Sequence, residues 1–244
     1  MLFITIGAIV GFVLTLTGSG GAILAIPMLV KWGHITLSNA TIVALPIVAI
    51  SALIPTVISK TKPNWRVLTG IVIAAIPSSY LVTFIKPYLP SSWILVSIIT
   101  LSIWAIYSVW APEKESNSSL QKSNGGHYIL IGVIVGTLTT LTGLGGGILL
   151  VPLLRRIIGL PLNKANATSL GIILIIVTSS FLMQISVVQH ELSKSIIIDL
   201  IFGVLLANMG ANLLLGKCSE LCQAIIRKAF FTLVVIISII LLAI

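Results

Sequence analysis

The stretch that decides the fold is Gly11-Phe-Val-Leu-Thr-Leu-Thr-Gly-Ser-Gly-Gly-Ala-Ile-Leu-Ala-Ile-Pro-Met-Leu29. It returns 125 residues later as Gly136-Thr-Leu-Thr-Thr-Leu-Thr-Gly-Leu-Gly-Gly-Gly-Ile-Leu-Leu-Val-Pro-Leu-Leu154. The two copies are identical at eleven of nineteen positions, and each is an apolar run that glycines interrupt at the same place. Such a duplicated break is typical of transporters built from structural repeats, in which the substrate site lies at the breaks. The sequence therefore predicts two homologous halves and directs the search for function to the two breaks.

The composition is that of a membrane protein. Charged residues make up 8% of the chain and hydrophobic residues 57%, with a mean hydropathy of +1.20, whereas about a quarter of a soluble domain is charged. Apolar runs of about 20 residues, enough to cross a bilayer, are predicted at 39–59, 66–86, 91–111, 166–189, 193–215 and 224–244, beside the glycine-broken runs 1–30 and 128–154. We expect an all-α polytopic membrane protein with about four hydrophobic segments in each half.

The halves are separated by one polar stretch. Residues 112–127 form this linker, which makes 1–111 the first transmembrane repeat and 128–244 the second. The tripeptide Asn39-Ala40-Thr41 recurs as Asn166-Ala167-Thr168, so the repeat extends past the glycine motif into the next helix.

The net charge of +9 does not predict a nucleic-acid partner. The Lys and Arg residues lie between the apolar runs, where lipid head groups and the positive-inside rule account for them. Cys218 and Cys222 are four residues apart without nearby metal-ligand partners, which favours packing or two free thiols. The expected partners are the lipid bilayer and a small substrate, with no cofactor and no metal, and the oligomeric state stays open.

Each broken run can be a bent span or a re-entrant hairpin. Bent spans divide the basic residues eight against six between the two sides, which gives no orientation. Re-entrant hairpins invert the halves and place only Lys31, Lys86 and Lys194 outside, against eleven basic residues on the cytoplasmic side. Because this bias follows the positive-inside rule, we predict inverted repeats with re-entrant helices at the start of each half.

Glycine-rich backbone inside a membrane suits an anion. Glycine takes conformations closed to other residues and leaves N–H groups uncovered, and irregular backbone persists at membrane depth only where it is buried or lines a cavity. The helix that follows each break offers free donors and a partial positive charge. The predicted substrate-binding residues are Thr17, Gly18, Gly20, Gly21, Thr142, Gly143, Gly145, Gly146 and Gly147.

Several hydroxyls surround the breaks and are further candidate donors: Thr15, Thr17, Ser19, Thr139, Thr140 and Thr142. The competing interpretation is that each hydroxyl bonds its own helix or glues helices together. Pro27 and Pro152 recur as well and are expected to kink or start a half-helix.

One acid, Asp199, falls inside a predicted span and is a candidate proton-coupling residue. Pairing with Lys194 near the interface is the alternative that we favour. Asn208, Asn212 and Gln184 are expected to make hydrogen bonds between helices.

The motif Thr-Gly-x-Gly-Gly-x-Ile-Leu, with Pro three residues on and a downstream Ala-Thr-Ser-Leu at 167–170, carries a family resemblance. The chain resembles the sulfite exporter TauE/SafE family of prokaryotic membrane permeases along its whole length. The resemblance implies a multi-pass protein of the cell membrane that transports, and usually exports, sulfite or organosulfur anions such as sulfonates.

Two other classes of function compete with anion transport. A channel or carrier for a cation or neutral solute would use half-helix C-termini and Asp199. A membrane enzyme or an accessory protein is the third class, but His34, His127 and His190 fall in or near loops, so no nucleophile and base pair is evident. We expect a permease without catalytic residues.

Overall fold

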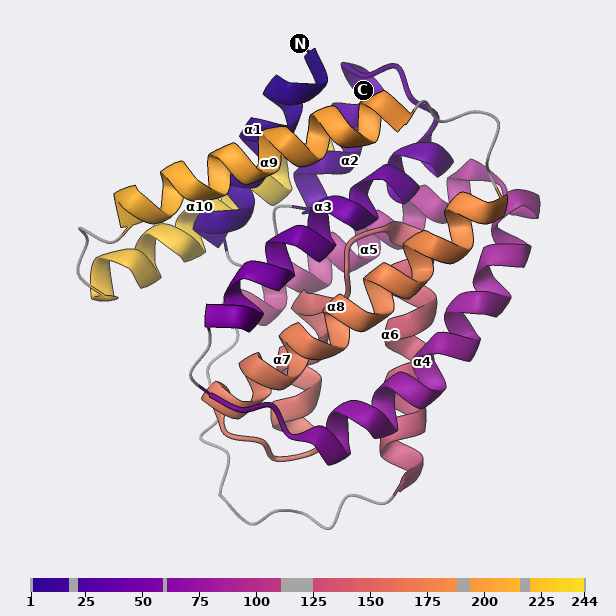
Figure 1. The fold of residues 1–244 in the computed structure, drawn as a ribbon, viewed down its shortest axis with the longest axis vertical. Coiled ribbons are helices and arrows are strands. Elements are labelled where there is room, and N and C mark those ends of the chain that lie inside the picture. The colour runs from indigo at the N-terminus through magenta and orange to yellow at the C-terminus, as the bar shows by residue number, and fades with distance from the viewer. Residues whose placement is uncertain are drawn as a thin grey trace.

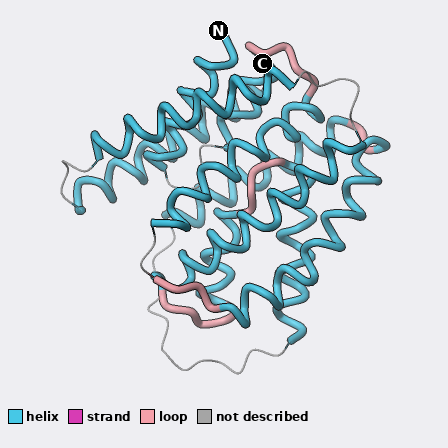
Figure 2. The backbone as a smooth tube through the Cα atoms, in the orientation of Figure 1, coloured by secondary structure: helices cyan, strands magenta, loops and turns pink. Residues whose placement is uncertain are grey.

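The computed structural model describes residues 2–17, 22–58, 61–110, 125–187, 194–215 and 220–243. This part of the chain forms α-helices and one short 3-10 turn, without a strand (Figures 1 and 2). The first half contains α1 (Leu2–Thr17), α2 (Ala22–Lys31), α3 (Leu37–Ile58), α4 (Trp65–Ile85), η1 (Lys86–Tyr88) and α5 (Ser91–Trp110). The second half contains α6 (Gly125–Thr142), α7 (Gly147–Arg156), α8 (Leu162–Val187), α9 (Lys194–Leu215) and α10 (Glu220–Ala243).

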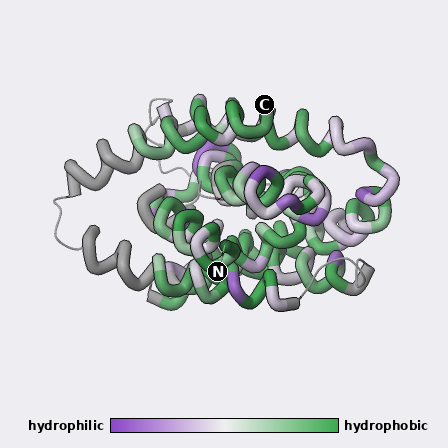
Figure 3. The backbone as a smooth tube through the Cα atoms, turned by 90° about the horizontal axis from the view of Figure 1, so that it is seen from above, coloured by the Kyte–Doolittle hydropathy of each residue, from purple (hydrophilic) through white to green (hydrophobic). Residues whose placement is uncertain are grey.

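The all-α polytopic membrane fold is confirmed. Five stretches within the described residues are long and apolar enough to cross a bilayer: Leu37–Val57, Trp65–Tyr88, Ser91–Ser108, Gly125–Thr142 and Leu162–Ile185. Large apolar side chains face outward as well as inward, since Val57 is 75% exposed and Ile73 is 72% exposed. Hydrophobic colours accordingly extend over the outside of the bundle (Figure 3). A surface of this kind is solvated by lipid rather than by water.

Glycines let two pairs of parallel helices touch along their backbones. Gly7 and Gly11 of α1 meet Leu200 and Val204 of α9, in the same order along both helices. A Cβ at Gly7 would lie 2.5 Å from the Leu200 carbonyl oxygen, so only glycine permits this approach.

The second close pair joins α6 to α4. Gly132 lies against Ile71 and Ala75, and Gly136 lies against Ala75 and Ser78. A Cβ at Gly132 would lie 2.4 Å from the Ile71 carbonyl oxygen. Each half therefore packs its first helix along a helix of the other half, while α3 and α8 pack together in the middle (Figure 1).

The helix directions show that α1 and α2 form one hairpin and that α6 and α7 form another. A Cβ at Gly33, just after α2, would lie 3.2 Å from the Phe3 ring at the start of α1, so α2 returns to the side on which α1 begins. In the second half, α6 and α8 both run parallel to α4, as the contacts of Gly132, Thr168 and Gln184 show. The chain must come back between two parallel helices, and α7 brings it back. These directions agree with the re-entrant interpretation and exclude one continuous span through the second break.

The repeated Asn-Ala-Thr tripeptides hold the two ends of α4. Thr168 of α8 accepts a hydrogen bond from the Asn64 backbone N–H at the start of α4, at 3.0 Å. Thr41 of α3 accepts one from the Lys86 Nζ at the other end, at 2.7 Å. Each threonine donates its own proton to a carbonyl one turn back, Lys164 or Ser38.

Candidate functional site

The second break begins where Gly143 ends α6. Gly143 has a positive φ of 70°, and its N–H donates to the Thr139 carbonyl at 2.8 Å. A Cβ at this position would lie 2.3 Å from the Thr41 carbonyl oxygen. The left-handed backbone and the contact with α3 both require glycine here. The turn is thus pressed directly onto the backbone of α3.

Gly145 and Gly146 complete the turn with φ values of 76° and 61°. Gly146 is the N-cap of α7 and provides no side chain to cap it. Within the described residues, no group accepts a hydrogen bond from the backbone N–H of Gly145, Gly146 or Gly147. The N-terminus of α7 therefore presents unused donors, which are the groups that an anion needs.

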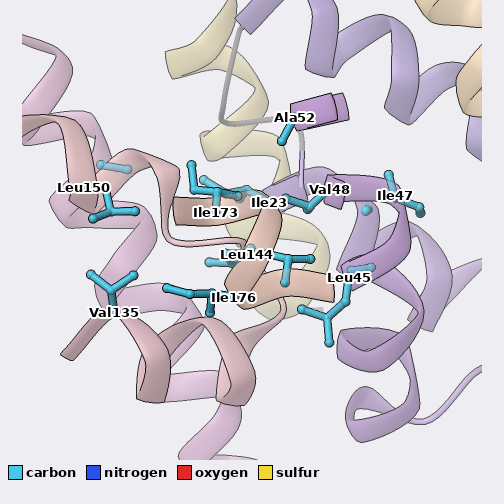
Figure 4. Packing of buried hydrophobic residues seen from close by; sticks show 14 of the residues in the cluster. Ile23, Leu45, Ile47, Val48, Ala52, Val135, Leu144, Leu150, Ile173 and Ile176 are labelled. Atoms are coloured by element: carbon cyan, nitrogen blue, oxygen red, sulfur yellow. The ribbon is translucent and has the colours of Figure 1, made fainter. Parts of the chain in front are cut away.

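The tip of the hairpin is anchored by one apolar side chain. Leu144 is 5% exposed and belongs to the hydrophobic core. Figure 4 shows it amid Ile173 and Ile176 of α8 and Leu45 and Val48 of α3. The burial of Leu144 fixes the glycines on either side, so the free donors are held in place before any ligand arrives.

A small cavity adjoins this turn. Its lining comes from α5, α6, the break and α7: Leu101, Leu138, Thr139, Thr142, Leu144, Gly146 and Leu149. The Thr139 hydroxyl is buried and has no hydrogen-bond partner among the residues that the structure describes. A Cβ at Gly146 would lie 2.6 Å from the Thr139 Oγ1, so the hydroxyl points at the α7 N-cap. Since an unpaired buried polar group costs free energy, this hydroxyl is a candidate ligand donor.

The other hydroxyls of α6 are engaged. Thr142 donates to the Leu138 carbonyl at 2.6 Å and accepts from the Leu144 N–H at 3.4 Å. Thr140 shares a hydrogen bond of 2.9 Å with Ser180 of α8. Thr142 lines the cavity, but its proton is already used, as the alternative interpretation of these hydroxyls expected. Sequence reasoning favoured Thr142 over Thr139 because Thr142 and its counterpart Thr17 directly precede the repeated glycines, whereas Thr139 has no threonine counterpart in the first half.

A buried lysine lies behind the break. Sequence reasoning counted Lys86 among the loop residues of the outer side. It does lie in η1 between α4 and α5, but its side chain turns inward and is 3% exposed. The Nζ donates to Thr41 Oγ1 at 2.7 Å, to Gln184 Oε1 at 2.6 Å and to the Thr140 carbonyl at 3.3 Å. No sequence signal marks this burial, because a lysine that follows an apolar run resembles an interfacial anchor. The hydrogen bonds between helices expected of Gln184 are confirmed.

The first break cannot be compared residue by residue. Gly18, Gly20 and Gly21 lie outside the described residues, as does the side chain of Thr17. The half-helices that follow the two breaks do correspond, because α2 and α7 each have 10 residues with proline at the sixth. Pro27 and Pro152 therefore lie inside the half-helices rather than at their starts. Pro27 leaves the Ile23 carbonyl without its helical N–H partner, and Ser238 of α10 donates to that carbonyl at 2.7 Å.

Asp199 lies in α9 and is partly buried. No residue of the described chain pairs with it. The side chain of Lys194, its expected partner, lies outside the described residues, as do those of Asn208 and Asn212. The structural and the proton-coupling interpretations of Asp199 both stay open.

Comparisons with known proteins point to a membrane transporter. The sequence profile of the family described as sulfite exporter TauE/SafE matches residues 3–241. A probable membrane transporter protein of Methanocaldococcus jannaschii is 31% identical over 181 residues, which covers 70% of this chain and 67% of the relative. No solved structure matches the chain.

Proposed function

The chain belongs to the sulfite exporter TauE/SafE family and is a multi-pass membrane permease, and we propose that it carries small anions, first of all sulfite or organosulfur anions such as sulfonates. The family name and the relative support transport, and the site supports an anion as the transported species. The prokaryotic cell membrane is the proposed location.

The proposal rests on two kinds of hydrogen-bond donor that lie together at the start of α7, backbone N–H groups and one hydroxyl. The N–H groups of Gly145, Gly146 and Gly147 lack acceptors within the described residues, and the buried Thr139 hydroxyl points at the same N-cap. A helix N-terminus attracts negative charge, and in a site away from water each donor binds an anion more strongly than it would in water. The oxygens of a sulfite or sulfonate would accept from these donors.

The apolar walls favour an anion with an apolar part. Leu101, Leu138 and Leu149 line the cavity together with Thr139 and Gly146. Ligand sites commonly combine such walls with a few converging polar groups. A short alkanesulfonate has oxygens that could accept from the backbone donors and carbon atoms that suit apolar walls, which makes this class a candidate beside sulfite itself.

The test is transport by purified protein in proteoliposomes. Uptake and efflux of radiolabelled sulfite, methanesulfonate and thiosulfate would be measured with and without a pH gradient. We expect saturable flux of at least one of these anions. Flux of a cation or neutral solute without anion flux would contradict the proposal.

Thr139→Val identifies the site. The variant removes an unsatisfied buried hydroxyl, so the protein should be as stable as the wild type or more so. A hydrogen bond to a charged group contributes ~1.5–3 kcal/mol, so anion affinity should fall about tenfold or more. The matched control is Thr137→Val, because the Thr137 hydroxyl donates to the Val133 carbonyl of its own helix and Thr137 does not line the cavity. Unchanged anion affinity in Thr139→Val would remove this hydroxyl from the site.

A further inference from the structure

Lys86 is the one charged side chain that is buried among the described residues. It comes from the end of α4 and reaches Thr41 of α3, Thr140 of α6 and Gln184 of α8. Four helices therefore meet at a single nitrogen. Nothing in the proposed site at the start of α7 requires this lysine, and its role is a separate question.

The hydrogen-bond partners of Lys86 match the ammonium form of its side chain. The Thr41 hydroxyl gives its own proton to the Ser38 carbonyl at 2.7 Å, so it can only accept from Lys86. The Thr140 carbonyl has no proton to donate. The Gln184 amide nitrogen is directed at the Thr140 carbonyl at 3.4 Å, which turns Oε1 toward Lys86. Three acceptors around one nitrogen suit the three N–H donors of the ammonium form.

The buried ammonium has no counter-charge within the described residues. All three of its partners are neutral, and the structure shows no ion pair to it. Neutral acceptors satisfy its hydrogen bonds but leave its charge, which the low dielectric of a protein interior screens only weakly. The Thr140 carbonyl belongs to the last turn of α6, where the helix dipole favours a cation.

Lys86 also lies directly behind the anion-accepting turn. Gly143 follows Thr140 by one turn of α6, about 5 Å of rise. The Gly143 backbone rests on the carbonyl of Thr41, the residue whose hydroxyl Lys86 holds. The ammonium thus fastens the C-terminal end of α6 to α3 and α8, while the N-terminal end of α7 stays uncapped.

We propose that Lys86 determines the charge selectivity of the permease: its ammonium makes the potential at the Gly143–Gly147 turn positive, and the substrate anion supplies its missing counter-charge. This inference rests on the proposed anion function and adds a specificity-determining residue that does not touch the substrate.

The experiment neutralises the charge without removing the lysine. Gln184→Glu keeps the shape of the side chain and an oxygen facing Lys86, but gives the ammonium a permanent counter-ion. Lys86→Met removes the charge itself. Binding of methanesulfonate and of dimethyl sulfone, a neutral molecule of similar shape, would be measured on purified full-length protein together with the thermal unfolding midpoint.

Both variants should lose affinity for methanesulfonate on the order of tenfold, the size of effect expected for the loss of one nearby charge in a partly screened site. Affinity for dimethyl sulfone should not change. The matched control is Lys62→Met, since Lys62 is exposed at the start of α4 and its loss should leave both affinities unchanged.

A purely structural role for Lys86 predicts a different result. The Gln184→Glu protein would then unfold at the same or a higher temperature and bind methanesulfonate as the wild type does, and this outcome would overturn the inference. If Lys86→Met does not fold, Gln184→Glu decides, because every acceptor of Lys86 is retained in it. A wild-type protein that binds none of the anions would overturn the proposed function itself.

Discussion

At the scale of single residues, Gly145 tolerates little change. Its φ is 76°, and a Cβ would lie 2.3 Å from Cγ1 of Val48 in α3. Gly145→Ala should therefore lower the thermal unfolding midpoint through two separate causes. The left-handed conformation costs ~1–2 kcal/mol for any residue with a Cβ, and the overlap with Val48 adds a steric term.

The double variant Gly145→Ala/Val48→Ala separates these causes. Removing the Val48 methyl groups should relieve the overlap but not the backbone strain, so the two changes should be less than additive in unfolding free energy, with a coupling of ~0.5–3 kcal/mol. Strict additivity would show that Val48 does not contact position 145 in the folded protein.

Two residues show what sequence could predict at this scale. The glycines at 143, 145 and 146 were predicted from the motif, and their positive φ values explain why the motif needs them. Thr139 was ranked below Thr142 because Thr142 is repeated in the first half and Thr139 is not. In the structure the repeated threonine has a structural role, since the Thr142 hydroxyl donates to a carbonyl of its own helix. Lys86 was missed because its burial depends on α3, α6 and α8 meeting around it, and no local pattern encodes that meeting.

At the scale of helices, the exposed ends of α4, α6 and α8 test the hairpin. Gly126 near the start of α6 and Asn163 near the start of α8 are exposed, and Tyr88 after α4 is 88% exposed. In a background with Cys218 and Cys222 replaced by serine, Gly126→Cys and Asn163→Cys should react with an impermeant thiol reagent from one face of the membrane. Tyr88→Cys should react from the opposite face, since α4 crosses between them.

Gly126 lies near the start of α6 and Asn163 lies just after α7. Whether cysteines at these two positions react from the same face of the membrane therefore decides between the hairpin and the bent span. Labelling of these two sites from opposite faces would mean that the second broken run crosses the membrane, contrary to the helix directions found here.

The helices themselves were largely predictable. Apolar runs predicted at 66–86 and 91–111 correspond to α4 at Trp65–Ile85 and α5 at Ser91–Trp110, because run length and hydropathy set these boundaries. Hydropathy could not decide whether the chain crosses the membrane or turns back at the second break, because a bent span and a hairpin of the same sequence have the same hydropathy. Tertiary contacts decide it, through Gly132 beside Ile71 and Thr168 beside Asn64. The internal repeat stays a prediction from sequence.

At the scale of the whole molecule, the burial of Lys86 increases the difference in the number of basic residues between the two sides of the membrane. Without it, the predicted outer side keeps only Lys31 and Lys194 against eleven basic residues on the cytoplasmic side. The cytoplasmic face of the whole protein should therefore be the one with the starts of α4, α6 and α8.

Coupling to a gradient is also a property of the whole molecule, and Asp199 tests it. If Asp199 pairs with a cation near the interface, Asp199→Asn should lower stability modestly and leave the response of transport to a pH gradient intact. Flux in proteoliposomes with and without the gradient is the measurement. Loss of gradient-driven flux with exchange retained would instead identify Asp199 as the proton carrier, because an amide cannot bind and release a proton.

The two threonine contacts at the ends of α4 limit how this permease can move. α4 is hydrogen-bonded to α8 through Thr168 at one end and to α3 through Thr41 at the other. These two contacts oppose tilting of α4 relative to α3 and α8. Relative tilting of these three helices would break one of the two hydrogen bonds. At the Lys86 end, it would leave a buried charge without one of its hydrogen-bond acceptors. We therefore expect α3, α4 and α8 to move together during transport, and the other helices to move relative to them.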